Sequence, residues 1–381
     1  MALNYDIIII GAGIVGAACA FECVRAGGVR VAVIEPRVVG SGATAAGMGH
    51  IVAMDDSPAQ LALTRYSQIL WRNLAPHLPP DCEFTASGTL WVAADDAEMD
   101  EVRRKAALYA QAGIPTEVLT AQQLAEAEPH LRRGLTGALR VPQDGVVYPP
   151  CVARFLLEQA RCLGADVLLG RTVRAVTDNG VLLDDGTNLS AGAVVNATGQ
   201  WAAEVTPGLP VKKRKGHLVI TDRYPQWVRH QLIELGYLKN AHALTADSVA
   251  FNVQPRATGQ LLIGSSRQYG AEGAEVETPV LQAMLRRATE YMPDLAKISA
   301  VRVWTGFRAA TPDHLPIIGR VGDSALYLAT GHEGLGVTTS LGTAQLIADM
   351  IVGRATAIDA RPYHPNRFAV PVSKVGGESK V

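Results

Sequence analysis

The first 35 residues of the chain constrain its fold more than any other segment. Residues 6–10 form a short apolar run of β-branched type, and the motif Gly11-Ala-Gly13-Ile-Val-Gly16 follows directly. A helical pattern continues to about Ala26, and a second apolar run over residues 30–35 ends in an acid. A strand, a glycine turn, a helix, a second strand and a terminal acid, in this order, are typical of the dinucleotide-binding βαβ unit.

Each part of this unit has a physical purpose. Gly11 permits a tight turn, Gly13 lets the backbone approach a pyrophosphate, and Gly16 allows the helix to pack close to the strand. The helix N-terminus offers N–H groups and the positive end of its dipole to the phosphates. Glu35 lies 19 residues after Gly16, where its carboxylate can accept hydrogen bonds from a ribose diol. The alternative, a glycine-rich turn that binds no nucleotide, is weakened by the flanking strands and the acid.

The charge balance argues against nucleic acid or membrane lipid as a partner, because 35 Lys and Arg residues stand against 36 Asp and Glu residues. A chain of 381 residues can bury a large core and is expected to hold two domains. The apolar run at residues 7–18 is interrupted by glycines and lacks a basic flank, which indicates a buried strand and helix rather than a signal peptide. No apolar run reaches about 18 residues, so no membrane span is expected.

Cysteine usage is typical of a reducing cytoplasm. The five cysteines are odd in number and form no Cys-x-x-Cys pair, so a disulfide framework, an iron–sulfur cluster and a structural zinc are all poorly supported. Cys19 and Cys23 lie four residues apart on the first helix and are expected to pack inward. Cys151 and Cys162 are also expected in the core. We predict no metal site.

The rest of the chain alternates between helical and strand-like patterns. Small residues dominate segment 40–49, which can lie flat against a large planar ligand. Two apolar runs end in glycine, at Gly199 and Gly331, as expected where an open α/β sheet binds its ligand. Residues 210–275 suggest a largely antiparallel sheet, and the tail after Val372 is expected to be disordered. Helices are predicted over residues 57–75, 95–112, 120–127, 151–163, 278–292 and 339–351.

Taken together, these segments resemble the D-amino-acid oxidase/glycine oxidase superfamily of flavoproteins over about residues 4–368. The blocks that carry the resemblance are IIIIGAGIVGAACA with Glu35, GATAAGMG, VVNATGQWA, WTGFRAATPDHLPIIG and TGHEGLGVTTSLGTAQLIADMI. The last two are similar to blocks of bacterial D-amino-acid dehydrogenases. The chain departs from the family at Ala309, where proline is frequent, and at Glu333, where a small residue is frequent.

A finer resemblance rests on one segment. The sequence GMGHIVAMDDSPAQLALTRYS is similar to the flavoprotein subunit of bacterial hydroxyproline-catabolic dehydrogenases, which act on D-hydroxyproline or similar imino acids. The resemblance therefore implies oxidation of a C–N bond in a small D-amino or imino acid, best matched by cis-4-hydroxy-D-proline or D-proline. A glycine or sarcosine oxidase that uses oxygen is one alternative. An FAD-bearing assembly or electron-relay subunit of a hetero-oligomer is another.

The superfamily implies an α/β fold in which a Rossmann-like FAD-binding domain is interleaved with a substrate domain built on an antiparallel sheet. The expected FAD-binding domain comprises residues 1–80, 145–207 and 301–370. The expected substrate domain comprises residues 81–144 and 208–300, and residues 371–381 form the tail. A cytoplasmic protein is expected. The resemblance allows a hetero-oligomer with other dehydrogenase subunits or a separate electron acceptor, and a peripheral membrane association through such an acceptor.

The resemblance implies FAD as the cofactor. The residues expected to contact it are Gly11, Gly13, Gly16, Glu35, Thr44, Ala45, Gly47, Met48, Val173, Thr198, Gly199, Trp201, Gly306, Gly331, His332, Gly334, Leu335, Gly336, Val337 and Thr338. Some relatives tether the flavin through a Cys at the place of Gly306 or a His at the place of Thr44. Neither residue type is present, so non-covalent FAD is expected.

Arg308 matches the family arginine that grips the substrate carboxylate. A planar guanidinium holds a carboxylate through two bonds and so fixes its distance and orientation. His50, after the flavin-contacting loop, and Tyr237, where relatives close the pocket with an aromatic residue, are weaker catalytic candidates. His332 matches a family position that acts through its backbone, so its side chain is not expected to take part. Asp313 and His314 are expected to shape their loop, and no group is assigned to deprotonate the substrate amine.

Overall fold

The glycine-turn segment folds as expected in the computed structural model, which describes residues 4–236 and 247–368. Strand β1 (Asn4–Ile10) leads into helix α1 (Ile14–Arg25) and then β2 (Val31–Glu35). Side chains on the two faces of β1 enter different cores: Ile7 and Ile9 pack on the helices, and Ile8 and Ile10 pack on the opposite side. Burial on both faces explains the uninterrupted apolar run.

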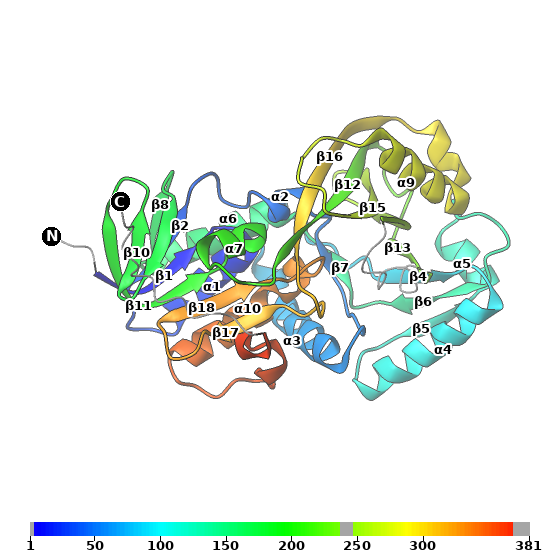
Figure 1. Cartoon of the computed structure of the whole chain (residues 1–381). Helices are drawn as coiled ribbons and strands as arrows, with labels where there is room; N and C mark the ends of the chain where they lie inside the picture. Colours follow the sequence, from blue (N-terminus) through cyan, green and yellow to red (C-terminus); the bar gives the residue numbers. More distant parts are fainter. Residues whose placement is uncertain (1–3, 237–246, 369–381) are drawn as a thin grey trace.

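The first sheet contains the dinucleotide-binding unit and has the strand order β17-β18-β11-β1-β2-β8, with β10 and β9 attached beside β11 (Figure 1). Strands β18, β11, β1, β2 and β8 are parallel to one another, and the edge strand β17 is antiparallel to β18. Helices α1, α6, α10 and α3 pack together on one face. The remaining strands and helices of this part span the following residues: β8 (Asp166–Leu169), β9 (Val173–Thr177), β10 (Gly180–Leu183), β11 (Asn188–Asn196), β17 (Ile317–Arg320), β18 (Leu326–Thr330), α3 (Pro58–Leu74), α6 (Pro149–Cys162) and α10 (Gly336–Ile351).

The second sheet has the order β16-β12-β15-β14-β13-β4-β6-β5 and is antiparallel except for the β13/β4 pair. Helix α9 packs against β14 and β15, and α4 and α5 pack at the β4-β6-β5 end. The bounds are β4 (Thr89–Ala93), β5 (Glu117–Thr120), β6 (Gly137–Val141), β12 (Lys212–Arg223), β13 (Gln231–Glu234), β14 (Ser248–Pro255), β15 (Gln260–Tyr269), β16 (Ala300–Ala310), α4 (Asp96–Gln111), α5 (Ala121–Ala127) and α9 (Thr278–Tyr291).

Short elements connect the two parts. Strands β3 (His50–Ile51) and β7 (Gly145–Val146) form a two-stranded pair between the sheets. Helices α2 (Ala43–Ala46) and α7 (Ala202–Val205) are one turn long. The 3₁₀ turns are Ala75–His77, Pro80–Cys82, Gly199–Trp201, Pro293–Lys297, Arg361–Tyr363 and Pro365–Arg367.

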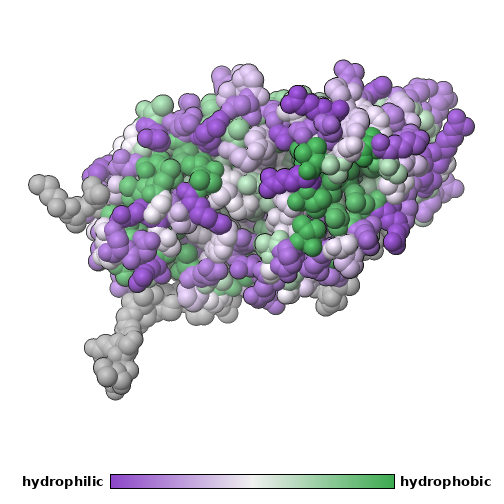
Figure 2. Space-filling view, turned by 90° about the horizontal axis from the view of Figure 1, so that it is seen from above, coloured by the Kyte–Doolittle hydropathy of each residue, from purple (hydrophilic) through white to green (hydrophobic). Residues whose placement is uncertain are grey.

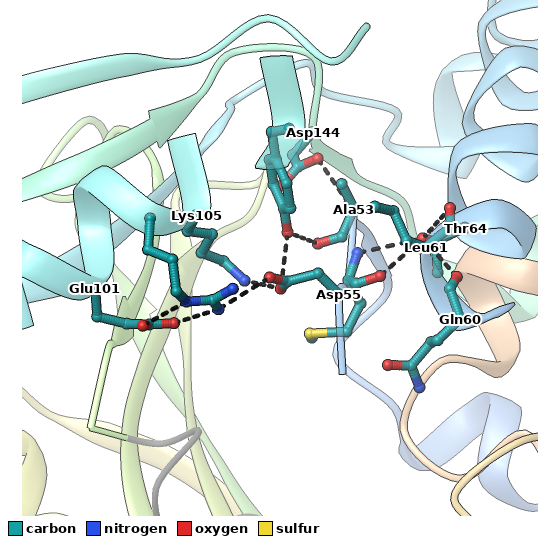
Figure 3. Close-up of polar contacts among 11 residues, drawn as sticks. Ala53, Asp55, Gln60, Leu61, Thr64, Glu101, Lys105 and Asp144 are labelled. Carbon is teal, nitrogen blue, oxygen red and sulfur yellow. Dashed lines mark hydrogen bonds and ion pairs between the residues drawn. The ribbon is translucent and has the colours of Figure 1, made fainter. Parts of the chain in front are cut away.

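A buried polar network joins α4 of the second part to the segment that follows β3 (Figure 3). The ammonium of Lys105 is fully buried and pairs with Asp55. Asp144 accepts hydrogen bonds from the Ala53 N–H at 3.1 Å and from the Gln68 amide at 2.7 Å. Burial raises the pKa of Asp144 to about 7, against the opposing effect of its hydrogen bonds. Through this network, α4 and the segment before β7 hold the residues that follow β3 in place.

The interleaved two-sheet architecture is as expected, but three details differ. Strand β16 pairs with β12 along its length, so the chain stays in the second sheet beyond the expected return at residue 301 and rejoins the first sheet at β17. Helix α10 begins at Gly336, three residues before the expected start. Cys19 and Cys23 are buried as expected, whereas Cys151 is half-buried and Cys162 is exposed, because both lie off the face of α6 that Val152, Leu156 and Ala160 bury.

The polarity of the surface and the length of the described helices bear on contact with a membrane. Figure 2 shows hydrophilic residues over most of the viewed face, with two apolar areas between them. In residues 4–236 and 247–368, no helix has the length and hydropathy needed to cross a bilayer. Nor does this part of the chain hold three or more His, Cys, Asp or Glu side chains arranged for a metal ion. The predicted tail 371–381 lies outside the described residues.

Candidate active site

A cavity of about 760 Å³ extends from the glycine turn of the first sheet to β12 and β16 of the second. Its volume falls in the range of cofactor and ligand pockets. Most residues predicted from the sequence line it, although far apart in the chain. These are Gly11, Gly13, Glu35, Thr44, Gly47, Met48, His50, Val173, Thr198, Gly199, Trp201, Gly306, Arg308, His332, Gly334, Gly336 and Val337.

Five predicted cofactor residues are not among the lining residues: Gly16, Ala45, Gly331, Leu335 and Thr338. Two of them have structural reasons for their identity or position. A β-carbon at Gly16 would collide with the Gly11 carbonyl oxygen, so Gly16 allows α1 to pack under the turn. Thr338 donates a 2.9 Å hydrogen bond to the His50 carbonyl and accepts one from the Val52 N–H, which fastens α10 to β3. Tyr237 lies outside the described residues.

The first end of the cavity is built around the α1 N-terminus. Gly11 has a φ of 102°, a conformation that favours glycine, and a β-carbon there would lie 2.8 Å from the Ala197 carbonyl oxygen. The Ile14 N–H donates to the Thr44 hydroxyl at 3.0 Å. The turn before the helix therefore carries no bulky side chain, and the helix N-terminus faces a loop of small residues, an arrangement suited to phosphates.

Glu35 stands at the end of β2, where the predicted ribose contact belongs. Its carboxylate accepts hydrogen bonds from the Ala12 N–H at 2.8 Å and from the Arg37 N–H at 2.9 Å. The residue is 6 % exposed and lines the cavity. The two backbone bonds fix the carboxylate beside the glycine turn, and its remaining lone pairs are available to a ligand.

The other end of the cavity contains Arg308 on β16. Its Nη1 atom donates to the Ser266 carbonyl oxygen at 3.0 Å. The Ser266 hydroxyl oxygen in turn lies 2.9 Å from the His217 N–H and 3.0 Å from the His217 Nδ1 atom. Because His217 Nε2 accepts the Glu277 N–H at 3.0 Å, the proton of the neutral ring is on Nδ1. This chain of bonds fixes the backbone that orients Arg308.

Two histidines line the cavity, and both are neutral at pH 7. Burial lowers the pKa of His50 to about 4 and that of His332 to about 4. His332 Nε2 lies 3.0 Å from the Thr343 hydroxyl, so its ring is held against α10. Among the described residues, the buried Nε2 of His50 has no hydrogen-bond partner. Neither ring carries the positive charge that would bind a carboxylate.

The structure adds contacts that the sequence did not reveal. Glu333, a point of departure from the family, forms an ion pair with the buried Arg214 and a 2.8 Å hydrogen bond with His314. Gly216 lies directly beneath the Arg308 guanidinium. These contacts join residues on separate strands and loops. They could not be predicted from the sequence, because they depend on the strand register. Asp313 pairs with Arg367, away from the cavity lining.

The cavity fits a long cofactor with a charged middle. It joins the α1 N-terminus that follows β1, an acid at the end of β2 positioned for a ribose, and the loop of small residues that comes after β2. A fold and a site of this kind define a flavin-dependent oxidoreductase. The family described as FAD dependent oxidoreductase (DAO) matches residues 6–350, so the chain belongs to this family, and FAD is its cofactor.

Similar proteins cover nearly the whole chain. Glycine oxidase of Geobacillus kaustophilus is 30 % identical, with 99 % of this chain and 100 % of the relative covered. Its crystal structure superimposes with a TM-score of 0.86, covering 96 % of this chain and 99 % of that one at 28 % identity. The hydrogen cyanide synthase subunit HcnC of Pseudomonas aeruginosa is 28 % identical, with 96 % of each covered. The structure of L-proline dehydrogenase from P. horikoshii has a TM-score of 0.85, 25 % identity, and coverage of 96 % and 98 %.

Proposed function

We propose that this protein oxidises the C–N bond of a small amino or imino acid to the imine. The observation that carries the proposal is the position of Arg308 on the cavity wall, at the end opposite the glycine turn. A guanidinium there can hold the substrate carboxylate through two charge-assisted bonds. The bound cofactor supplies a two-electron acceptor for the hydride that leaves the substrate α-carbon.

The residues around Arg308 bind and orient the substrate. Ser266 accepts one Arg308 N–H through its backbone carbonyl and so limits the rotation of the guanidinium. Fixing the carboxylate fixes the α-carbon relative to the cofactor, and orientation of this kind lowers the barrier of a hydride transfer. The substrate nitrogen must lose its extra proton before its lone pair can form the C=N bond. With a pKa near 4, His50 is a poor base for that proton, so we propose that the neutral amine binds.

The finer proposal is that the substrate is cis-4-hydroxy-D-proline or D-proline. Residues 47–67 support it through their resemblance to hydroxyproline-catabolic flavoprotein subunits, and the structural likeness to L-proline dehydrogenase agrees with a cyclic imino acid. A glycine oxidase that uses oxygen is the alternative favoured by the glycine oxidase relative. A subunit of a larger assembly is the alternative favoured by the HcnC relative.

The test is anaerobic mixing of the purified holoprotein with D- and L-amino acids, sarcosine, glycine, D-proline and cis-4-hydroxy-D-proline, while flavin absorbance is followed. We expect the two D-imino acids to bleach the flavin fastest. Faster bleaching by glycine or sarcosine would favour the glycine oxidase alternative. Absence of bleaching by every compound would favour a subunit without its own substrate.

A further inference from the structure

Two arginines face each other across the β12/β16 pair. Arg214 is the direct cross-strand partner of Arg308, so both side chains start from the same face of the sheet. Arg308 lines the cavity, whereas Arg214 is 1 % exposed and does not line it. Like charges directly opposite each other on a sheet destabilise it, so this pair requires a nearby negative charge.

Glu333 supplies that charge from the loop after β18. One of its carboxylate oxygens forms the ion pair with Arg214, and the other lies 2.8 Å from His314 Nδ1. Arg214 also lies over the Tyr269 ring, at 4.4 Å from the ring centre. Because Glu333 lines the cavity and Arg214 does not, the carboxylate of Glu333 covers Arg214 on the cavity side.

The backbone indicates that this carboxylate is held at some energetic cost. Glu333 has a φ of 49° and its partner His314 has a φ of 60°, both in the left-handed region. This conformation is unfavourable for a residue other than glycine, because its β-carbon comes too close to the following carbonyl oxygen. Strained positions of this kind gather at functional sites. A glycine at position 333 would relieve the strain but would leave Arg214 without this carboxylate.

We propose that Glu333 determines the charge of the substrate that the site accepts. Its carboxylate occupies the position that a second substrate carboxylate would take against Arg214. A dicarboxylate would meet this negative charge inside a desolvated cavity, whereas a monocarboxylate amino or imino acid would meet only the guanidinium of Arg308 as its anchor. The inference rests on the proposed function, because it requires that Arg308 bind the first carboxylate.

The experiment measures ligand binding by the change in flavin absorbance of the holoprotein. The probes are pyrrole-2-carboxylate and pyrrole-2,5-dicarboxylate, which share a ring and differ by one carboxylate. The variants are Glu333→Ala, which empties the position, and Glu333→Gln, which keeps its shape without its charge. Asp313→Asn is the matched control, because it removes one negative charge next to His314 from a pair with Arg367.

The wild-type protein and Asp313→Asn should prefer the monocarboxylate. Glu333→Ala should bind the dicarboxylate at least about tenfold more tightly than the wild type does, since Arg214 gains a charge-assisted partner, and Glu333→Gln should show a smaller gain. An unchanged preference in both Glu333 variants would overturn the inference, as would loss of flavin from both. If the wild type binds neither probe and no amino acid reduces its flavin, the proposed function itself fails.

Discussion

Gly216 and Arg308 are in contact across neighbouring strands, and the guanidinium of Arg308 occupies the space where a Gly216 side chain would begin. A β-carbon at Gly216 would lie 2.5 Å from Arg308 Nη1 and 3.0 Å from Cζ. The backbone of Gly216 is not in the left-handed region, so glycine is required there for space and not for conformation. The orientation of Arg308 therefore depends on the absence of one methyl group on β12.

Gly216→Ala should accordingly displace Arg308 without removing its charge. We expect a higher KM and a slower flavin reduction, on the order of tenfold to a hundredfold in kcat/KM, because misorientation of about 1 Å has effects of this size. Stopped-flow flavin reduction measures the KM and the reduction rate, and the flavin content of the variant is measured alongside. Gly192→Ala on β11 is the control, since its β-carbon would lie 3.3 Å from the Asp6 carbonyl, remote from Arg308. Equal activity of Gly216→Ala and wild type would contradict this relationship.

FAD should leave the protein on denaturation. Position 306 is glycine and position 44 is threonine, so the two tethering residues seen in relatives are missing, and no cysteine lines the cavity of the described chain. Acid precipitation followed by absorbance of the supernatant measures the released flavin. Yellow colour retained in the precipitate would show a covalent link and contradict the prediction.

Glu35→Ala should weaken retention of FAD. The variant loses a charged acceptor for the ribose and also the bonds that the carboxylate accepts from the Ala12 and Arg37 N–H groups. Hydrogen bonds to a charged group contribute about 1.5–3 kcal/mol each, so the dissociation constant should rise by about tenfold or more. Fluorescence titration of the apoprotein with FAD measures it. Glu35→Gln keeps the shape of the side chain, so its dissociation constant for FAD should lie between those of wild type and Glu35→Ala. An unchanged dissociation constant in Glu35→Ala would show that Glu35 does not bind the cofactor.

The stability of the fold should depend on the protonation of Asp144. Its pKa in the folded protein is about 7, above the value of about 3.9 for an unfolded chain. The folded state therefore binds more protons between these values, so this carboxyl lowers stability as the pH rises from about 4 to 7, by a few kcal/mol at most. Asp144→Asn should flatten this part of the profile in urea unfolding at several pH values. The exposed Asp100→Asn should leave the slope unchanged, and a slope retained in Asp144→Asn would contradict the assignment.

The sequence predicted the parts of this molecule that depend on local pattern. The glycine turn, its two strands and Glu35 follow from spacing alone, because each residue type meets a local steric or hydrogen-bonding requirement. Helix α5 begins at the expected N-cap Thr120, with a capping box to Gln123. The family blocks led to the residues that now line one cavity. These features need no knowledge of which strands pair.

Features that depend on strand register could not be predicted. The pairing of Arg214 with Arg308 follows from the alignment of β12 with β16, and no pattern within either strand specifies it. For the same reason β16 was expected in the first sheet, since its sequence block continues into β17 without a break in pattern. Cys162 was expected to be buried because cysteine usually is, but it lies off the face of α6 that packs on the core.

The central claim is that Arg308 binds the carboxylate of an amino or imino acid whose hydride the flavin accepts. Removing one partner of this buried charge pair should cost about 3–5 kcal/mol, and orientation is lost with it. Arg308→Lys should recover part of the loss, because a point charge lacks the planar fork.

The most direct measurement is anaerobic flavin reduction by the best substrate of the panel, compared between wild type and Arg308→Ala at equal flavin content. We predict that wild type is reduced and that kcat/KM falls by about a hundredfold to a few thousandfold in Arg308→Ala. Reduction of Arg308→Ala at the wild-type rate and affinity would contradict the account.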